Sequence, residues 1–99
     1  MGLFHFGRPD PAEALRLCRE TPGAVLLDVR TREEYRCGCL PGSLNLPVDQ
    51  IGEIASLVPD LSTPIFVCCL SGARSFLAAR QLKQRGYTSI TDLGGIAAG

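Results

Sequence analysis

The hydrophobic positions along the chain follow two patterns that alternate. Residues 24–29 and 64–68 form two apolar runs rich in Val, Leu and Ile, which is typical of strands covered on both faces in a parallel sheet. Residues 11–19 and 73–85 instead repeat apolar side chains at helical spacing, and Gly86 is suited to end the second helix. The pattern therefore predicts strands and helices in alternation.

Shorter elements are expected between these segments. Thr31, with Glu34 three residues later, has the form of a capping box, which predicts a short helix directly after the first strand. Pro59 is expected to end a helix that precedes it. Along the chain the sequence also predicts a short strand within residues 40–47, a weakly amphipathic helix over 48–57 and a last strand over 89–93.

The order of the elements and the composition together predict the fold. Strands and helices repeated at short spacing favour right-handed crossovers, so we expect an α/β fold with a small central parallel sheet of about five strands and helices on both faces. The 99 residues are 45% hydrophobic and 20% charged, as expected for a single compact domain over residues 1–99. In such sheets ligands bind beyond the carboxyl ends of the strands.

Charge and cysteine content narrow the function classes. Ten basic and ten acidic residues give a formal net charge of zero, so no broad field favours nucleic acid or an anionic membrane surface. The absence of an apolar run long enough for a signal peptide or a membrane span predicts a cytoplasmic protein. In a reducing cytosol the five cysteines are expected to be catalytic, metal-binding or buried rather than paired in disulfides.

The junction between the apolar run 64–68 and the helix that starts near Ala73 is the candidate for chemistry. Cys69 stands at the end of a buried strand, where the N–H groups of the following helix's first turn have no carbonyl partners. These donors favour a thiolate or an oxyanion, Gly72 permits the tight backbone path, and Arg74 adds positive charge. A free cysteine is commonly only a small buried side chain, but this loop favours a nucleophile.

Four segments, in order along the chain, carry a resemblance to a known family. Cys69-Leu-Ser-Gly-Ala-Arg-Ser75 resembles the active-site loop of the rhodanese family, Cys-x-Ser-Gly-x-Arg-Ser. Residues 27–35 are similar to its Asp-Val-Arg…Glu-(Tyr/Phe) segment, residues 38–43 to its Gly-His-Ile-Pro-Gly-Ala turn, and residues 92–96 to its closing Gly-Gly-Ile segment. The resemblance covers nearly the whole chain and implies the rhodanese-like arrangement of the sheet and helices.

The resemblance also implies a cycle of sulfur transfer through Cys69. The thiolate would attack the sulfane sulfur of a small-molecule donor such as thiosulfate, hold it as a persulfide, and yield it to a thiophilic acceptor such as cyanide, a thiol or a protein. Neither a metal nor an organic cofactor is implied. Arg74 is expected to contact the donor anion and to stabilise the loop. The residues expected to bind substrate are Leu70, Ser71, Gly72, Ala73, Arg74 and Ser75.

Cys39 stands where the family usually has His, and with Cys37 it forms a second thiol cluster. If either thiol approaches Cys69, it could resolve a persulfide as a disulfide, which would give a thiol-redox step or an internal sulfur relay. A soft-metal site that adds Cys68 is disfavoured, because the spacing is unlike that of zinc sites and Cys68 should face away from Cys69. The only histidine, His5, lies near the start of the chain, so the loop itself must activate the thiol.

Three other interpretations use the same residues. A phosphatase or arsenate reductase of the dual-specificity type shares the general fold but needs five residues between Cys and Arg, whereas Cys69 and Arg74 enclose four. A persulfide carrier or interaction module that serves a protein partner uses the same loop and stays open. A catalytically dead binding domain is disfavoured because both residues are present. Asp28 and Arg30 are expected to form a structural ion pair rather than to catalyse.

Overall fold

The computed structural model describes residues 11–69 and 72–95, and each helix and strand expected there is present. In chain order the elements are α1 (Pro11–Glu20), β1 (Val25–Asp28), α2 (Arg32–Arg36), β2 (Leu44–Asn45), the 3-10 helix η2 (Val48–Glu53), α3 (Ile54–Leu57), β3 (Ile65–Cys69), α4 (Ala73–Gln84) and β4 (Ile90–Gly95).

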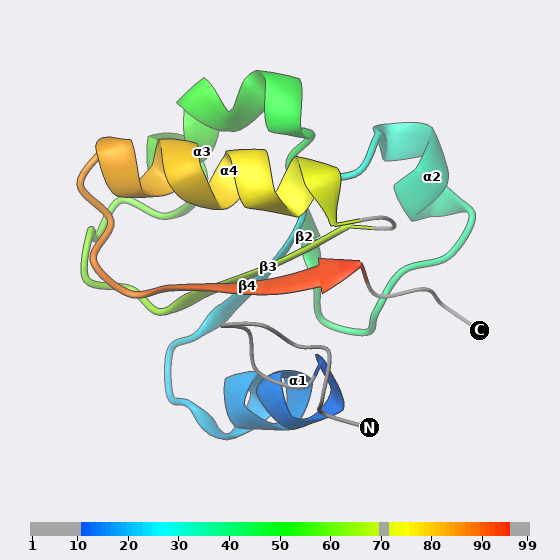
Figure 1. Cartoon of the computed structure of the whole chain (residues 1–99), viewed down its shortest axis with the longest axis horizontal. Helices are drawn as coiled ribbons and strands as arrows, with labels where there is room; N and C mark the ends of the chain where they lie inside the picture. Colours follow the sequence, from blue (N-terminus) through cyan, green and yellow to red (C-terminus); the bar gives the residue numbers. More distant parts are fainter. Residues whose placement is uncertain (1–10, 70–71, 96–99) are drawn as a thin grey trace.

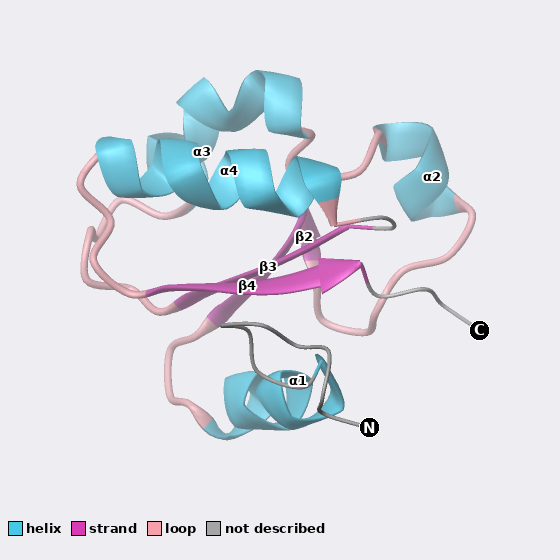
Figure 2. Cartoon of the chain, in the orientation of Figure 1, coloured by secondary structure: helices cyan, strands magenta, loops and turns pink. Residues whose placement is uncertain are grey.

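The strands form one parallel sheet between two layers of helices. Its order is β2-β1-β3-β4, so the described residues supply four strands against the expected number of about five. Helix α1 covers one face of the sheet, and α4, α3 and η2 cover the other (Figures 1 and 2). The expected α/β arrangement with helices on both faces is confirmed.

The core has two halves because neighbouring strand residues point to opposite faces of the sheet. Leu27, Val67 and Cys69 face the helices α4 and η2, in a cluster that also contains Leu82. The other half lies against α1 and is built from the alternate positions Leu26, Phe66 and Cys68 together with Ala14, Cys18 and Leu93. The two adjacent cysteines of β3 therefore lie in different halves of the core, as the strand alternation predicts.

The segment 48–57 differs from the single helix that its pattern predicts. It begins as a 3-10 helix, with the Gln50 N–H donating to the Pro47 carbonyl, and becomes α-helical only at Ile54. Short 3-10 turns are common at helix starts, and Gly52 costs a regular α-helix about 1 kcal/mol relative to Ala. The helix then ends at Leu57, before Pro59, as expected.

Leu27 is the first position at which we predict the effect of a substitution. Its side chain is 0% exposed at the centre of the sheet. Leu27→Ala should lower the free energy of unfolding by about 2–5 kcal/mol, because it leaves a cavity between β1 and α4. Leu17→Ala is the matched control, since Leu17 is 53% exposed on α1. Urea denaturation measures both, and equal losses for the two variants would contradict the assigned core.

Candidate active site

The candidate site lies at the carboxyl end of β3, where the chain turns directly into α4. Figure 1 shows α2 at this same end of the sheet, to the right of the view. Gly72 caps α4 in a left-handed conformation, with φ of 93°. A residue with a side chain would pay about 1–2 kcal/mol for that conformation, so Gly72 permits the short connection.

Two backbone N–H groups donate to the thiol of Cys69. The Gly72 nitrogen lies 2.9 Å from Sγ, and the Ser75 nitrogen lies 3.3 Å from it. Ser75 Oγ donates to the Gly72 carbonyl at 3.1 Å and holds the turn closed. First-turn N–H groups have no helical acceptors, and the positive end of the helix dipole lies beside the sulfur. The arrangement therefore stabilises negative charge on a sulfur that is only 2% exposed.

The structure brings together five of the seven residues that the sequence assigned to the site. Cys69 ends β3, Gly72 caps α4, and the first turn of α4 contains the other three, Ala73, Arg74 and Ser75. Leu70 and Ser71 lie outside the described residues. His5 lies outside them as well.

Arg74 forms an ion pair with Glu34 that the sequence did not predict. Its Nη1 and Nη2 lie 2.6 and 3.1 Å from the two carboxylate oxygens of Glu34. Both side chains are about one-third exposed. Glu34 also closes the predicted capping box with Thr31, which is confirmed. Part of the positive charge expected near the thiol is thus balanced by Glu34.

The Arg74 guanidinium lowers the pKa of Glu34 to about 2, assisted by hydrogen bonds from Thr31. Because the folded-state pKa lies below the ordinary value of 4.5, the ion pair stabilises the fold above that pH and the contribution is lost as the pH falls toward 2. Replacing Glu34 by Gln keeps an acceptor for the capping box and removes the charge.

We expect Glu34→Gln to lower the melting temperature most above about pH 5, and the difference from wild type to shrink toward zero near pH 2. Thermal unfolding followed by circular dichroism at a series of pH values measures this. Glu33→Gln, at the exposed neighbouring position, is the control for loss of one negative charge. A difference that does not change with pH would show that the ion pair is not its cause.

Asp28 and Arg30 form the expected ion pair at the end of β1. Arg30 Nη2 lies 2.8 Å from Asp28 Oδ2, and the side chains are 13% and 3% exposed. The same nitrogen donates to the Gly38 carbonyl at 2.6 Å. The pair fastens the loop after α2 to the sheet, which is a structural role.

Cys68 is unsuited to nucleophilic chemistry. Burial raises the pKa of its thiol to about 12, and the nearby Asp28 carboxylate adds to the effect. Its side chain lies in the core half against α1, whereas Cys69 faces α4. Cys18, in the same core half as Cys68, also has a pKa raised by burial. Among these three buried thiols, it is that of Cys69 that accepts the two N–H hydrogen bonds of the α4 turn.

Comparison with known proteins decides the family. The sequence model of the rhodanese-like domain matches residues 10–98. The chain belongs to the rhodanese-like family. The site described above occupies the strand-to-helix loop that carried the resemblance in the sequence.

Named relatives of this rhodanese-like chain include short and long proteins. It is 35% identical over 71 residues to the thiosulfate sulfurtransferase PspE of Escherichia coli (strain K12), covering 71% of this chain and 68% of PspE. It is 38% identical over 72 residues to the adenylyltransferase and sulfurtransferase uba4 of Ogataea parapolymorpha, covering 72% of this chain but only 18% of uba4. A solved structure described as rhodanese with anions from E. coli has a TM-score of 0.69 and 33% identity, over 73% of this chain and 86% of that one.

Cys39 stands where the family's usual turn has His, and Cys37 lies two residues before it. Both side chains are exposed. The carbonyl of Gly38 between them accepts a hydrogen bond from Arg30, which also pairs with Asp28. Within the described residues, no group of three or more His, Cys, Asp or Glu side chains could hold a metal ion.

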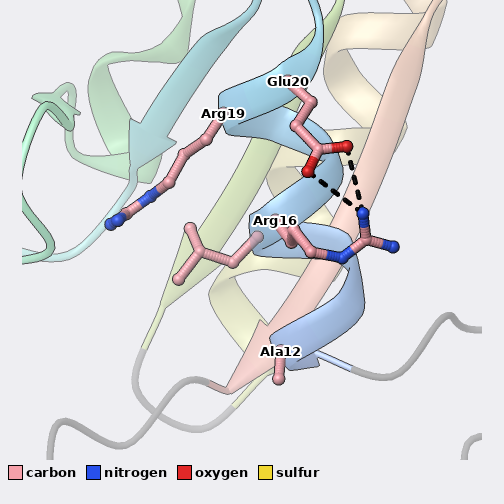
Figure 3. Close-up of a pocket in the computed structure, with 5 residues that line it drawn as sticks. Ala12, Arg16, Arg19 and Glu20 are labelled. Atoms are coloured by element: carbon pink, nitrogen blue, oxygen red, sulfur yellow. Dashed lines mark hydrogen bonds and ion pairs between the residues drawn. The ribbon is translucent and has the colours of Figure 1, made fainter.

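Three surface hollows have linings that do not include the Cys69 thiol. One lies along α1, where Figure 3 shows Arg16 pointing toward Glu20, and the two side chains form an ion pair at 3.0 Å. The other two lie beside α2, one lined by Arg32, Tyr35, Arg36 and Asn45 and one by Thr31, Arg32, Glu33, Pro47, Asp49 and Gln50. None of these linings includes a cysteine, so the candidate for covalent chemistry stays at Cys69.

Proposed function

We propose that this rhodanese-like chain is a sulfurtransferase that carries sulfane sulfur as a persulfide on Cys69. The observation that carries the proposal is the pair of N–H donors, from Gly72 and Ser75, at 2.9 and 3.3 Å from the sulfur. A thiolate and a persulfide anion both need such donors, and neither needs a metal. The names of relatives such as PspE support sulfur transfer as the reaction class.

The first half-reaction would transfer a sulfur atom from the donor to Cys69. Its thiolate attacks the outer sulfur of a donor such as thiosulfate, a new S–S bond forms, and sulfite leaves with the electron pair of the broken bond. The N–H groups of Gly72 and Ser75 would stabilise the negative charge on the attacking sulfur and then on the persulfide. Arg74 and the loop residues Leu70, Ser71 and Ala73 are proposed to shape the donor site, with Arg74 held in place by Glu34.

The second half-reaction would return the enzyme to its starting state. A thiophilic acceptor such as cyanide or a thiol attacks the terminal sulfur of the persulfide. The S–S bond breaks, and Cys69 leaves as a thiolate into the same pair of N–H donors. No oxidant or reductant enters this cycle, because the sulfur only changes its partner.

A persulfide carrier that serves a protein partner is the second candidate. It uses the same thiol and the same cradle, by which we mean the N–H groups of Gly72 and Ser75 that donate to Cys69 Sγ. It differs from the enzyme only in its sulfur donor and acceptor. The similarity to part of uba4 favours this candidate, because there the matching segment is 18% of a longer protein whose name joins adenylyl transfer to sulfur transfer. A redox role for Cys37 and Cys39 receives less support, because only the exposure of their side chains favours it, whereas two N–H groups donate to the Cys69 thiol.

A reducing compartment such as the cytoplasm is part of the proposal. All five cysteines are free thiols, and a persulfide cycle requires Cys69 to stay reduced between turnovers. In the described part of the chain, no helix has the length and apolar character needed to cross a membrane.

Steady-state kinetics with thiosulfate and cyanide test the enzyme proposal. A persulfide intermediate separates the two half-reactions, so double-reciprocal plots at several fixed cyanide concentrations should be parallel. Intersecting lines would indicate direct transfer with both substrates bound and would contradict the intermediate. If Cys69 takes up sulfur from thiosulfate but does not pass it to cyanide, the persulfide-carrier function would be favoured over the enzyme.

A further inference from the structure

The outer face of α4 combines exposed apolar side chains with cations. The inner face buries Ser75, Ala78, Ala79 and Leu82 against the sheet. At 100° per residue, the opposite face carries Phe76, Leu77, Arg80 and Lys83. Phe76 and Leu77 are each 51% exposed, and Arg80 and Lys83 are exposed as well. We call these four residues the α4 patch.

The charge of this part of the chain has one sign. Between Asp60 and Asp92 the sequence contains no acidic residue. Arg80 and Lys83 have no ion-pair partner within residues 11–69 and 72–95, whereas Arg74 is occupied by Glu34. The α4 patch therefore offers two uncompensated positive charges beside two exposed apolar side chains.

The α4 patch begins at the end of α4 that carries the reactive thiol, on the face of the helix turned away from the sheet. Phe76 directly follows Ser75, whose N–H donates to Cys69 Sγ at 3.3 Å. With a rise of 1.5 Å per residue, Lys83 lies about 12 Å along the helix axis from Ser75. That length suits a short segment of a protein and exceeds what a small sulfur donor spans.

We propose that the α4 patch docks an acidic segment with apolar side chains, on a protein whose thiol exchanges sulfur with Cys69. The inference rests on the proposed function, because it names the acceptor class for the same site. The protein thiolate would attack the terminal sulfur of the Cys69 persulfide and form its own persulfide, while the Cys69–sulfur bond breaks and Cys69 leaves as thiolate. Atoms and charge balance without an oxidant or a reductant.

A second copy of the chain fits the α4 patch less well than an acidic partner. Two such faces would bring Arg80 and Lys83 of each copy together, and like charges at contact repel. An anionic membrane is also disfavoured, since two cations give little attraction on a chain of zero net charge. Complementary charge and apolar contact together point to a protein segment.

The test uses persulfidated protein and three acceptor thiols: 2-mercaptoethanol and two peptides of equal length with one Cys, in which Leu residues alternate either with Asp or with Lys. We expect sulfur transfer to the Asp peptide to be about tenfold faster than to the Lys peptide at low salt, and the preference to shrink as salt is raised. Arg80→Glu/Lys83→Glu should reverse the preference and leave transfer to 2-mercaptoethanol within about twofold of wild type.

Two matched controls lie on α1, on the other side of the sheet. Arg19→Glu repeats a charge reversal at an exposed position there, and should keep the preference for the Asp peptide. Phe76→Ser/Leu77→Ser should slow transfer to both peptides, while Leu17→Ser should not. Circular dichroism melting of each variant shows whether the fold is retained. The salt dependence of the peptide preference is measured on the wild type, so it tests the proposal even if a variant fails to fold.

Several outcomes would overturn the docking proposal. Equal transfer rates to the two peptides in the wild type would do so, as would a preference that survives Arg80→Glu/Lys83→Glu. Dimer formation through the patch, or stronger binding of the wild type to phosphatidylserine vesicles than to the Asp peptide, would assign the face to another occupant. Failure to load sulfur on Cys69 at all would instead contradict the proposed function on which this inference depends.

Discussion

Cys69→Ser is expected to abolish sulfur transfer from thiosulfate to cyanide, with a loss of about a thousandfold or more, as is typical when a covalent nucleophile is removed. The serine hydroxyl fits the space left by the thiol, so the two N–H groups remain in place. It does not ionise near neutral pH and cannot form a persulfide. Thiocyanate production, measured at matched protein concentration, gives the loss directly.

The other thiols provide the controls for this substitution. Cys37→Ser and Cys39→Ser change exposed side chains and should retain activity within about twofold, since surface substitutions usually have small effects. Cys69→Ser should melt close to the wild-type temperature. Residual turnover by Cys69→Ser above a tenth of wild type would place the nucleophile elsewhere. A large loss in Cys37→Ser or Cys39→Ser would instead support the internal relay.

Gly72→Ala is expected to lower activity more than its effect on stability explains. The backbone at Gly72 has φ of 93°, which a side chain disfavours by about 1–2 kcal/mol. Relief of that strain moves the N–H group that lies 2.9 Å from Cys69 Sγ. Loss of one donor to a developing negative charge lowers turnover by about 100-fold or more in comparable sites.

Gly23→Ala is the matched control for Gly72→Ala. Gly23 also has a positive φ, of 75°, and an added methyl group there meets nothing within 4 Å. It lies in the turn between α1 and β1, away from the thiol. Both variants should lose similar stability in urea, but only Gly72→Ala should lose turnover. Equal turnover losses would show that the N–H donors of the cradle have no special part in the reaction.

Most of the fold follows from local sequence patterns. The runs 24–29 and 64–68 become β1 and β3 because Val, Leu and Ile are buried there on both faces of the sheet. Alternation within β3 also places Cys68 and Cys69 in opposite halves of the core, as expected. The 3-10 helix η2 was not predicted, because its pattern of apolar residues is also compatible with an α-helix.

The candidate thiol and its cradle could be predicted, but the ion pair beside them was missed. Cys69 could be identified because it ends a predicted strand and is followed by Gly72 and a predicted helix. Glu34 lies forty positions from Arg74, and its capping box with Thr31 already explained its presence. A signal for this ion pair existed. β1 and β3 are neighbouring parallel strands, and each is followed at once by a helix. The first turns of α2 and α4 therefore meet at one end of the sheet, which brings Glu34 and Arg74 together.

Mapping sulfur on the protein tests the central claim most directly. Reduced protein is treated with thiosulfate and divided into two samples, and cyanide is added to one of them. Both samples are then alkylated and digested, and mass spectrometry gives the mass of each cysteine peptide. The account predicts one additional sulfur on Cys69 alone, which cyanide removes. Sulfur on Cys37 or Cys39 but not on Cys69, or thiocyanate production without sulfur on any cysteine, would contradict the account.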